Sequence, residues 1–126
     1  QPGELEYEPD LVVADVSFIS LTKVLPAVLA CCAPACDALV MVKPQFEVGR
    51  ERVGKGGVVR DPELRREAVA SVARFARDEL GAGVHGFAPS GLPGPKGNLE
   101  TFVWLCERGR AGAIADLDGA IAEVAA

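Results

Sequence analysis

Three charged residues lie at the ends of apolar segments that the sequence predicts to be strands. Asp15 ends the segment LVVAD, Lys43 ends ALVMVK, and Glu100 directly precedes TFVWLCE. In open α/β sheets ligands bind beyond the carboxyl ends of the parallel strands, so these positions are the first to inspect. A lysine between two acids can take part in proton transfer, because the acids favour the ammonium form whereas burial favours the neutral amine. The same spacing also fits a structural ion pair at the edge of the sheet.

The elements that must position these residues alternate between strands and helices. Apolar and β-branched runs predict strands at 11–15, 38–43, 84–88 and 101–107. Helical spacing, together with the start signal Asp61-Pro62 and the stop signal Gly81, predicts helices within 17–32, from 61 to about 81, and within 116–126. Strands that alternate with helices predict the α/β class, with a mainly parallel sheet whose faces are covered.

The connections between the strands predict their directions. The first two strands end 28 residues apart (43 − 15 = 28), which is the length of one βαβ unit, so they are expected to be parallel neighbours. The segment PSGLPGPKGN at 89–98 is too rich in glycine and proline for a crossover helix, so the last strand is expected to run antiparallel to the one before it. An antiparallel strand begins where parallel strands end. Glu100 is therefore expected to face the same crevice as Asp15 and Lys43.

A glycine-rich basic loop follows the second predicted strand. The run from Gly49 to Lys55 fits the first seven positions of a P-loop, but Gly56 stands where the magnesium-binding Ser or Thr is required. The helix cap at Asp61 also comes six residues after the lysine (61 − 55 = 6), which argues against a P-loop. Two interpretations remain, a loop that approaches a polyanion and a solvated connector.

Composition limits the class of protein. A chain of 126 residues with 49% hydrophobic residues can form one domain with a real core. The net charge of −5 argues against a uniformly basic coat for nucleic acid. No apolar run reaches the ~20 residues that span a bilayer and no signal peptide is visible, so the cytoplasm is the expected compartment. The four cysteines lack zinc-ribbon spacing and are expected to be reduced, mostly buried thiols, with no metal site.

Five other side chains are expected to be structural or allow two interpretations. His85 falls within a predicted strand and is expected to be structural. Phe102 and Trp104 alternate along the last strand, which favours core packing over a base-stacking platform. Lys96 and Asn98 belong to the glycine-proline loop, where a substrate contact and a turn role are both open.

Three blocks of sequence together resemble one known family. DLVVADVSFISL, VKPQFEVGRERVGKGGVVRDP and GPKGNLETFVWL occur in this order between residues 9 and 107. They resemble the C-terminal two thirds of the methyltransferase domain of the TlyA family, which is related to FtsJ-type RNA 2′-O-methyltransferases and is also catalogued as haemolysin A. The resemblance implies a Rossmann-like methyltransferase fold, S-adenosylmethionine as the cofactor and ribosomal RNA ribose as the substrate.

The resemblance also implies roles for individual residues. FtsJ-type enzymes use a Lys-Asp-Lys-Glu tetrad, and three of its members carry over as Asp15 in VADVSF, Lys43 in VKPQFE and Glu100 in GNLE. Lys43 would activate or orient the ribose 2′-hydroxyl for a direct methyl transfer that needs no metal, and Glu100 would fix the lysine or the hydroxyl. Asp15 would hold Lys43 and, with Ser17, lie at the cofactor. The expected RNA contacts are Arg50, Arg52, Lys55, Lys96 and Asn98.

Several family features should precede Asp15, namely the first lysine, the glycine-rich cofactor loop and a small RNA-binding domain. Residues 1–10, QPGELEYEPD, are acidic with two prolines and show no glycine-rich turn, so we expect them to be a connecting segment. Residues 11–126 are then expected to be the C-terminal part of the methyltransferase domain. Such a fragment is expected to be inactive alone and to self-associate through an uncovered sheet edge. Two other functions stay open, a non-catalytic RNA-binding module and a haemolysin-type membrane-active protein, although no basic amphipathic helix supports the latter.

Overall fold

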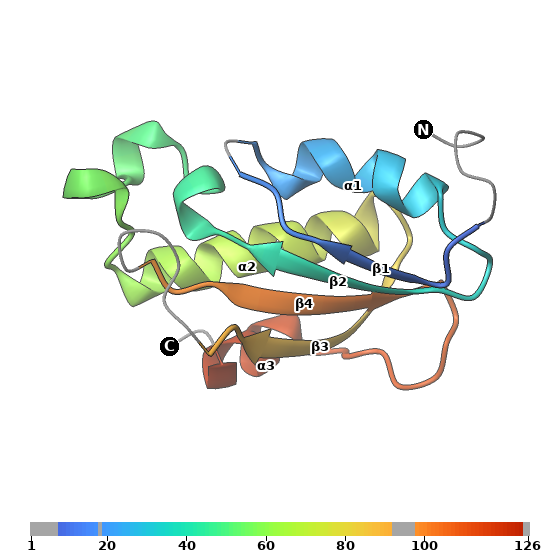
Figure 1. The fold of residues 1–126 in the computed structure, drawn as a ribbon. Helices are drawn as coiled ribbons and strands as arrows, with labels where there is room; N and C mark the ends of the chain where they lie inside the picture. Colours follow the sequence, from blue (N-terminus) through green and yellow to red (C-terminus); the bar gives the residue numbers. More distant parts are fainter. Residues whose placement is uncertain (1–7, 18, 92–97, 125–126) are drawn as a thin grey trace.

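Four strands form one mixed sheet in the order β1-β2-β4-β3 (Figure 1). The computed structural model describes residues 8–17, 19–91 and 98–124. The strands are β1 Leu11–Ala14, β2 Asp37–Val42, β3 Gly83–Pro89 and β4 Thr101–Cys106. β1 pairs in parallel with β2, while β4 pairs antiparallel with both β2 and β3. The predicted α/β class, the parallel first pair and the antiparallel last strand are thus confirmed. The position of β4 between β2 and β3 was not anticipated.

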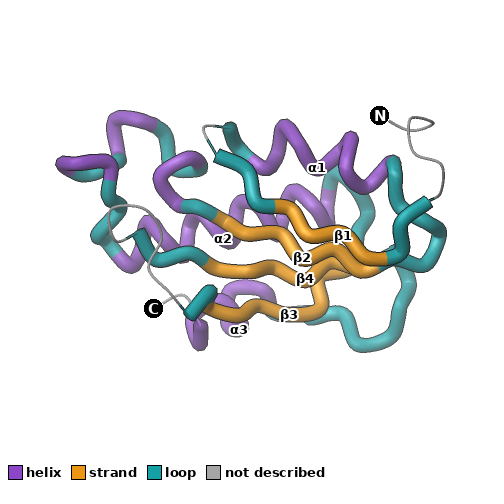
Figure 2. Tube along the Cα trace, in the orientation of Figure 1, coloured by secondary structure: helices purple, strands orange, loops and turns teal. Residues whose placement is uncertain are grey.

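Within the described residues, three α-helices connect or follow these strands (Figure 2). They are α1 Leu21–Ala30, α2 Pro62–Asp78 and α3 Leu117–Val124. α1 begins four residues later than the first residue of the predicted range, because the Ser20 side chain accepts the Thr22 N–H (3.1 Å) and so caps the helix at that point. α2 begins as predicted, with Asp61 as the cap and Pro62 in the first turn.

One face of the sheet carries the core. Buried side chains from all three helices join the inward side chains of the strands in a single cluster, and α2 crosses behind the sheet in Figure 1. On the strands these side chains alternate, as in Ala38, Val40 and Val42 of β2. Leu25 of α1 is completely buried, and burial of a side chain of this size stabilises the fold by about 1.5–3 kcal/mol.

The opposite face of the sheet, called here the outer face, keeps large apolar side chains at the surface. Leu11 and Val13 of β1 are 59% and 63% exposed, and Trp104 of β4 is 39% exposed. Phe102 alternates to the same side as Trp104 and, like it, does not belong to the core cluster. The expectation that Phe102 and Trp104 belong to the core is therefore wrong. It failed because alternation separates the two faces of a strand without saying which face the helices cover.

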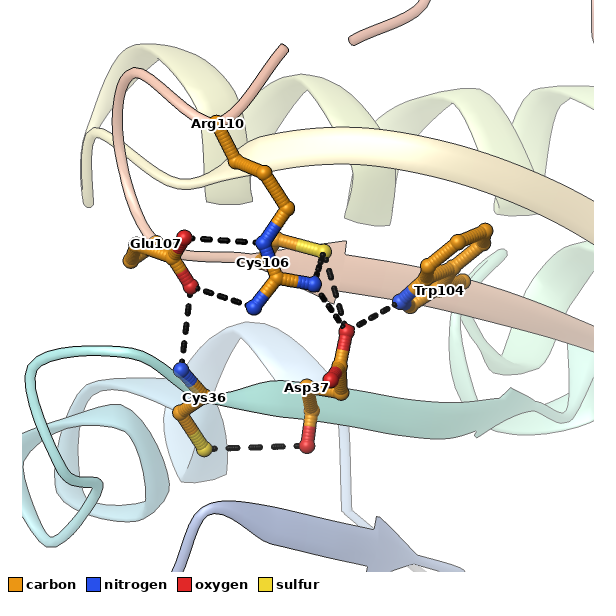
Figure 3. Close-up of polar contacts among 6 residues, drawn as sticks. All are labelled: Cys36, Asp37, Trp104, Cys106, Glu107 and Arg110. Carbon is orange, nitrogen blue, oxygen red and sulfur yellow. Dashed lines mark hydrogen bonds and ion pairs between the residues drawn. The ribbon is translucent and has the colours of Figure 1, made fainter. Parts of the chain in front are cut away.

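A polar cluster closes the edge of the sheet where β2 begins and β4 ends (Figure 3). Its members come from β2, β4 and the segments that flank them, and they are Cys36, Asp37, Trp104, Cys106, Glu107 and Arg110. The Arg110 guanidinium donates to the carboxylates of both Asp37 and Glu107. Asp37 also accepts the Trp104 indole N–H (2.8 Å), and the Glu107 carboxylate accepts the Cys36 backbone N–H (3.0 Å).

These bonds lower the pKa values of both carboxyl groups. Hydrogen bonds from Trp104, then Cys106 and Arg110, hold the pKa of Asp37 below its usual range. The hydrogen bonds from Arg110 and from the Cys36 N–H lower the pKa of Glu107 to about 2. A charge-assisted, forked contact between arginine and carboxylates fixes geometry as well as adding energy. The cluster therefore ties the segment after β4 to the start of β2.

His85 contributes to the same outer face. It lies in β3 at an irregularity of the pairing with β4, and its ring centroid is 5.5 Å from that of Trp104. This contact agrees with the structural role predicted for His85.

Candidate active site

Lys43 and Asp15 meet at the carboxyl ends of the two parallel strands. β1 ends at Ala14 and β2 at Val42, so each charged residue immediately follows its strand. The Lys43 Nζ lies 2.5 Å from Asp15 Oδ1 and donates a hydrogen bond to Ser17 Oγ at 3.2 Å. Lys43 is only 9% exposed, whereas the Asp15 side chain is 53% exposed. The ammonium is thus held from one side, and its partners remain open to solvent.

Glu100 reaches the same edge from the opposite chain direction. β4 begins at Thr101, which pairs with Val42 of β2, so Glu100 stands beside the residue that follows Val42, namely Lys43. Glu100 is 7% exposed, and its Oε2 is buried without a hydrogen-bond partner in the part of the chain that the structure describes. Burial raises the pKa of Glu100, the charge of Lys43 opposes that rise, and the charge of Asp15 adds to it. The structure therefore brings the three sequence-predicted residues together.

The two carboxyl groups lie in different environments. Asp15 is exposed and ion-paired with Lys43, while Glu100 is buried and has a raised pKa. Pairs of carboxyl groups whose environments differ in this way are a common basis for proton transfer and for the orientation of a hydroxyl. A buried carboxyl group with a shifted pKa beside a lysine indicates a candidate functional site, and structural ion pairs can also shift a pKa.

Glu47 also lies at this end of the strands, and no sequence pattern singled it out. Its carboxylate accepts hydrogen bonds from the Ser20 hydroxyl (2.6 Å) and from the Leu21 backbone N–H (2.8 Å). Burial raises the pKa of Glu47, while these two bonds oppose the rise. Glu47 lies one short turn after Lys43 and thus ties the loop after β2 to the start of α1. No periodic pattern predicts a contact between residues so far apart in sequence.

The glycine-rich basic loop forms short turns instead of a phosphate-binding helix start. The 3-10 turns η2 Arg50–Arg52 and η3 Lys55–Gly57 precede α2, and Gly56 and Gly57 have positive φ angles of 77° and 79°. Glycine adopts such angles without steric strain, which explains these residues at this bend. Arg50 and Lys55 lie in η2 and η3, and Lys96 lies outside the described residues.

Two of the predicted RNA contacts have partners within the protein. Arg52 forms a two-bond ion pair with Glu67 of α2. Asn98 is 1% exposed, its Oδ1 accepts the Val59 N–H (2.8 Å), and its Nδ2 donates to the Gly57 carbonyl (2.9 Å). The structure therefore gives Asn98 the loop-stabilising role rather than a contact with RNA. A buried amide bonded in this way cannot also reach a phosphate.

A separate cavity of about 380 Å³ lies at the other end of the strands, away from Lys43. Its lining includes the thiols of Cys32, Cys36 and Cys106. All four cysteines are free, and Cys36 and Cys106 are buried. Burial is the main cause that raises the pKa of Cys36 to about 12 and that of Cys106 to about 11. Because the thiolate is the nucleophilic form, these two thiols are poor nucleophiles at neutral pH.

Within the described residues no helix is long and apolar enough to cross a membrane.

The chain is similar to known proteins over most of its length. It is 57% identical over 96 residues to the 16S/23S rRNA (cytidine-2′-O)-methyltransferase TlyA of Mycobacterium tuberculosis. The matched segment covers 76% of this chain and 35% of that protein. It is 40% identical over 97 residues to the candidate rRNA methyltransferase YqxC of Bacillus subtilis, covering 77% of this chain and 34% of that protein. The chain therefore spans about a third of the length of these curated relatives.

The fold is similar to that of solved structures and the sequence matches a family profile. The crystal structure of a candidate hemolysin from Lactococcus lactis aligns with a TM-score of 0.83 and 32% identity, covering 94% of this chain and 57% of that one. The profile described as FtsJ-like methyltransferase matches residues 2–106. The chain belongs to the FtsJ-like methyltransferase family.

Proposed function

We propose that this chain carries the catalytic edge of an S-adenosylmethionine-dependent 2′-O-methyltransferase that acts on ribosomal RNA in the cytoplasm. The observation that carries the proposal is the contact of Lys43 with Asp15 and Ser17 beside the buried Glu100. The relatives named as rRNA methyltransferases support the substrate class. A lysine held between carboxyl groups at the carboxyl edge of an α/β sheet suits a reaction in which a hydroxyl must be oriented and lose its proton.

Each residue of the edge has a distinct role in this proposal. S-adenosylmethionine supplies an electrophilic methyl group to the ribose 2′-oxygen. Lys43 orients or activates the 2′-hydroxyl through its Nζ, and Asp15 holds that Nζ in place. Glu100, whose buried Oε2 has no hydrogen-bond partner among the described residues, accepts a hydrogen bond from the hydroxyl or from Lys43. Asp15 and Ser17, both exposed and next to Lys43, fit the polar groups of the cofactor as hydrogen-bond partners.

The basic loop is proposed to approach the RNA backbone. Arg50 and Arg52 come from η2 and Lys55 from η3, and both turns follow Lys43 along the chain. Lys96 belongs to the segment that precedes Glu100. Phosphate contacts of this kind position the substrate and make binding sensitive to salt. To contact RNA, Arg52 would exchange its Glu67 partner for a phosphate.

We expect that these 126 residues alone neither bind the cofactor tightly nor transfer a methyl group. The chain spans 57% of the solved Lactococcus lactis structure and about a third of the curated relatives. The family resemblance assigns the glycine-rich cofactor loop to residues that precede Asp15. In this proposal, residues 11–126 are the C-terminal part of the methyltransferase domain, and 1–10 form an acidic connection. Calorimetric titration of S-adenosylmethionine into the folded chain should show no saturable heat, and clear binding would contradict this part of the proposal.

The open edge of β1 is proposed to cause self-association. Among the residues that the structure describes, β1 pairs only with β2, and its Leu11 and Val13 are strongly exposed. Unpaired strand edges with apolar side chains are templates for association. Sedimentation velocity at rising protein concentration should show larger species, and Val13→Lys should reduce them. A concentrated wild-type chain that stays monomeric would refute this expectation.

The catalytic proposal is tested in a longer protein that contains this sequence together with the rest of the family domain. Lys43→Met should reduce methyl transfer to ribosomal RNA by about 10²-fold or more, the size typical of losing a group that acts on the proton. Lys23→Met is the matched control, because Lys23 is an exposed lysine of α1 outside the site. Near-wild-type transfer by Lys43→Met would refute the catalytic role. A longer protein that binds ribosomal RNA but transfers no methyl group even with Lys43 intact would favour a non-catalytic RNA-binding module.

A further inference from the structure

Glu47 connects the two loops that carry Lys43 and Asp15. One carboxylate oxygen accepts the Ser20 hydroxyl (2.6 Å) and the other accepts the Leu21 N–H (2.8 Å). Ser20 is the cap of α1, and its loop begins at Asp15 directly after β1. A negatively charged group is favourable at a helix N-terminus, because the first backbone N–H groups there lack partners within the helix. The carboxylate thus fixes the far end of the loop that contains Asp15.

The backbone between Lys43 and Glu47 is a hydrogen-bonded turn. The Phe46 N–H donates to the Lys43 carbonyl (3.0 Å), and the N–H groups of Glu47 and Val48 donate to the Pro44 carbonyl (3.0 and 3.1 Å). Pro44 adds a fixed φ angle to this turn. A displacement of Glu47 is therefore transmitted to Lys43 instead of being absorbed between them.

Two side chains, Lys43 and Glu47, consequently join the same pair of loops. Lys43 holds Asp15 and Ser17, and four residues further along Glu47 holds Ser20 and Leu21. The contacts of Lys43 and Glu47, together with the paired strands β1 and β2, form a closed ring. This ring restricts movement of the Lys43 side chain relative to Asp15. Ser20 alone already caps α1, so the bonds of the half-buried Glu47 carboxylate serve mainly to join the two loops.

From this geometry we propose that Glu47 is a positioning residue that holds Lys43 against Asp15 and Ser17. Glu47 itself lies outside the reacting atoms and acts through the two loops. The structural part of the proposal stands on the contacts described above, and its effect on methyl transfer rests on the proposed function. Loss of the Glu47 bonds lets the loop after β1 separate from the loop after β2, so that the Lys43 amine becomes accessible.

The first test measures the accessibility of Lys43 in this chain without any catalytic readout. Folded protein is acylated with trace acetic anhydride, and the labelling rate of each lysine is measured by mass spectrometry. Lys23, already exposed on α1, is the internal reference. Glu47→Ala should raise the rate at Lys43 relative to Lys23 by about tenfold or more, since two charge-assisted hydrogen bonds are lost. Glu47→Gln can still form two bonds and should stay within about twofold of the wild type.

Further variants keep the test decisive. If Glu47→Ala does not fold, Glu47→Asp keeps the charge but is one methylene shorter, so it cannot reach both partners and should also raise labelling at Lys43. Equal labelling of Lys43 in the wild type and the folded variant would overturn the proposal. A parallel rise at Lys43 and Lys23 would also overturn it, because that result indicates general loosening of the fold.

The second test measures methyl transfer in the longer protein. Glu47→Ala should lower kcat by up to about 10²-fold, the effect of a displacement of ~1 Å at a reacting group, with KM for RNA changed less than about twofold. Glu47→Gln should restore kcat. If labelling changes as expected but Lys43→Met remains active, the positioning role stands and the proposed function fails. If labelling is unchanged and Lys43→Met is inactive, the function stands and the positioning role fails.

Discussion

Replacement of Asn98 by alanine should destabilise the chain by detaching the glycine-rich loop. Asn98 is 1% exposed, and its side-chain amide bonds both to the Val59 N–H and to the Gly57 carbonyl. These bonds join residues that are 39 and 41 positions apart, so they hold the loop before α2 next to the start of β4. Alanine removes both bonds and supplies no replacement.

The size of the effect follows from the burial of the two partners. Val59 is 2% exposed, and a buried N–H left without an acceptor costs about 1–3 kcal/mol. Gly57 is half-buried, so water can partly replace the bond to its carbonyl. We therefore expect a loss of about 2 kcal/mol in the free energy of unfolding. With a urea dependence of about 1–3 kcal/mol/M for a small domain, the midpoint should fall by about 1 M.

Urea unfolding followed by far-UV circular dichroism measures this loss directly. Leu99→Ala is the matched control, since Leu99 is the neighbouring residue and is 48% exposed, and its effect should stay within about 0.5 kcal/mol. Amide exchange in Asn98→Ala should accelerate at Val59 more than at Val103 in the centre of β4. If the urea midpoint of Asn98→Ala equals that of the wild type and the Val59 amide is still protected from exchange, the loop-stabilising role of Asn98 is refuted.

Two carboxyl groups should give opposite dependences of stability on pH. Burial raises the pKa of Glu100 above its ordinary value of 4.5, so ionisation of this group destabilises the fold. Stability is therefore lost as the pH rises through the raised pKa. Glu100→Gln should thus be more stable than the wild type at pH 7 and equal to it below about pH 4.5. Hydrogen bonds from Arg110 lower the pKa of Glu107 to about 2, so its stabilising effect is present above pH 4.5 and is lost as pH falls towards 2. Glu107→Gln should therefore be less stable at pH 7, with the difference shrinking below about pH 4.5. Urea midpoints between pH 2 and pH 8 test both, and parallel curves for a variant and the wild type would contradict the corresponding assignment.

The sequence contained enough to locate the three charged residues of the candidate site. Apolar runs defined strand ends within one residue, and the length of the first connection indicated the parallel pair. The glycine-proline segment excluded a crossover helix, which fixed the direction of β4 and brought Glu100 to the edge of Asp15 and Lys43. Each step used a local pattern and one topological rule.

The sequence contained less about the faces of the sheet and the order of its strands. The insertion of β4 between β2 and β3 depends on which edges pair, and no local pattern records that choice. The wrong assignment of Phe102 and Trp104 to the core has the same origin. A strand presents two faces with similar side chains, and only the placement of helices on one face decides which is buried.

Side chains that act through distant hydrogen bonds were not predictable either. Glu47 bonds to residues 26 and 27 positions earlier, and Asn98 to residues 39 and 41 positions earlier. Hydrophobic periodicity reports on faces of elements and says nothing about the partner of a polar side chain in a loop. The role of Asn98 could be limited only to a turn or a substrate contact, and no sequence pattern indicated a role for Glu47.

Carboxyl groups at the two ends of the strands lie in opposite environments, and this contrast supports the proposed functional site. At one end Asp37 and Glu107 are paired with Arg110, and their pKa values fall, so that ionisation stabilises the fold. At the other end Glu100 is buried and Glu47 is half-buried, and burial raises the pKa values of both groups, so that their ionisation opposes folding. A sequence selected for stability alone would replace such groups with neutral ones. Their presence beside a buried lysine is explained most simply by a task that requires proton affinity and fixed geometry at that end.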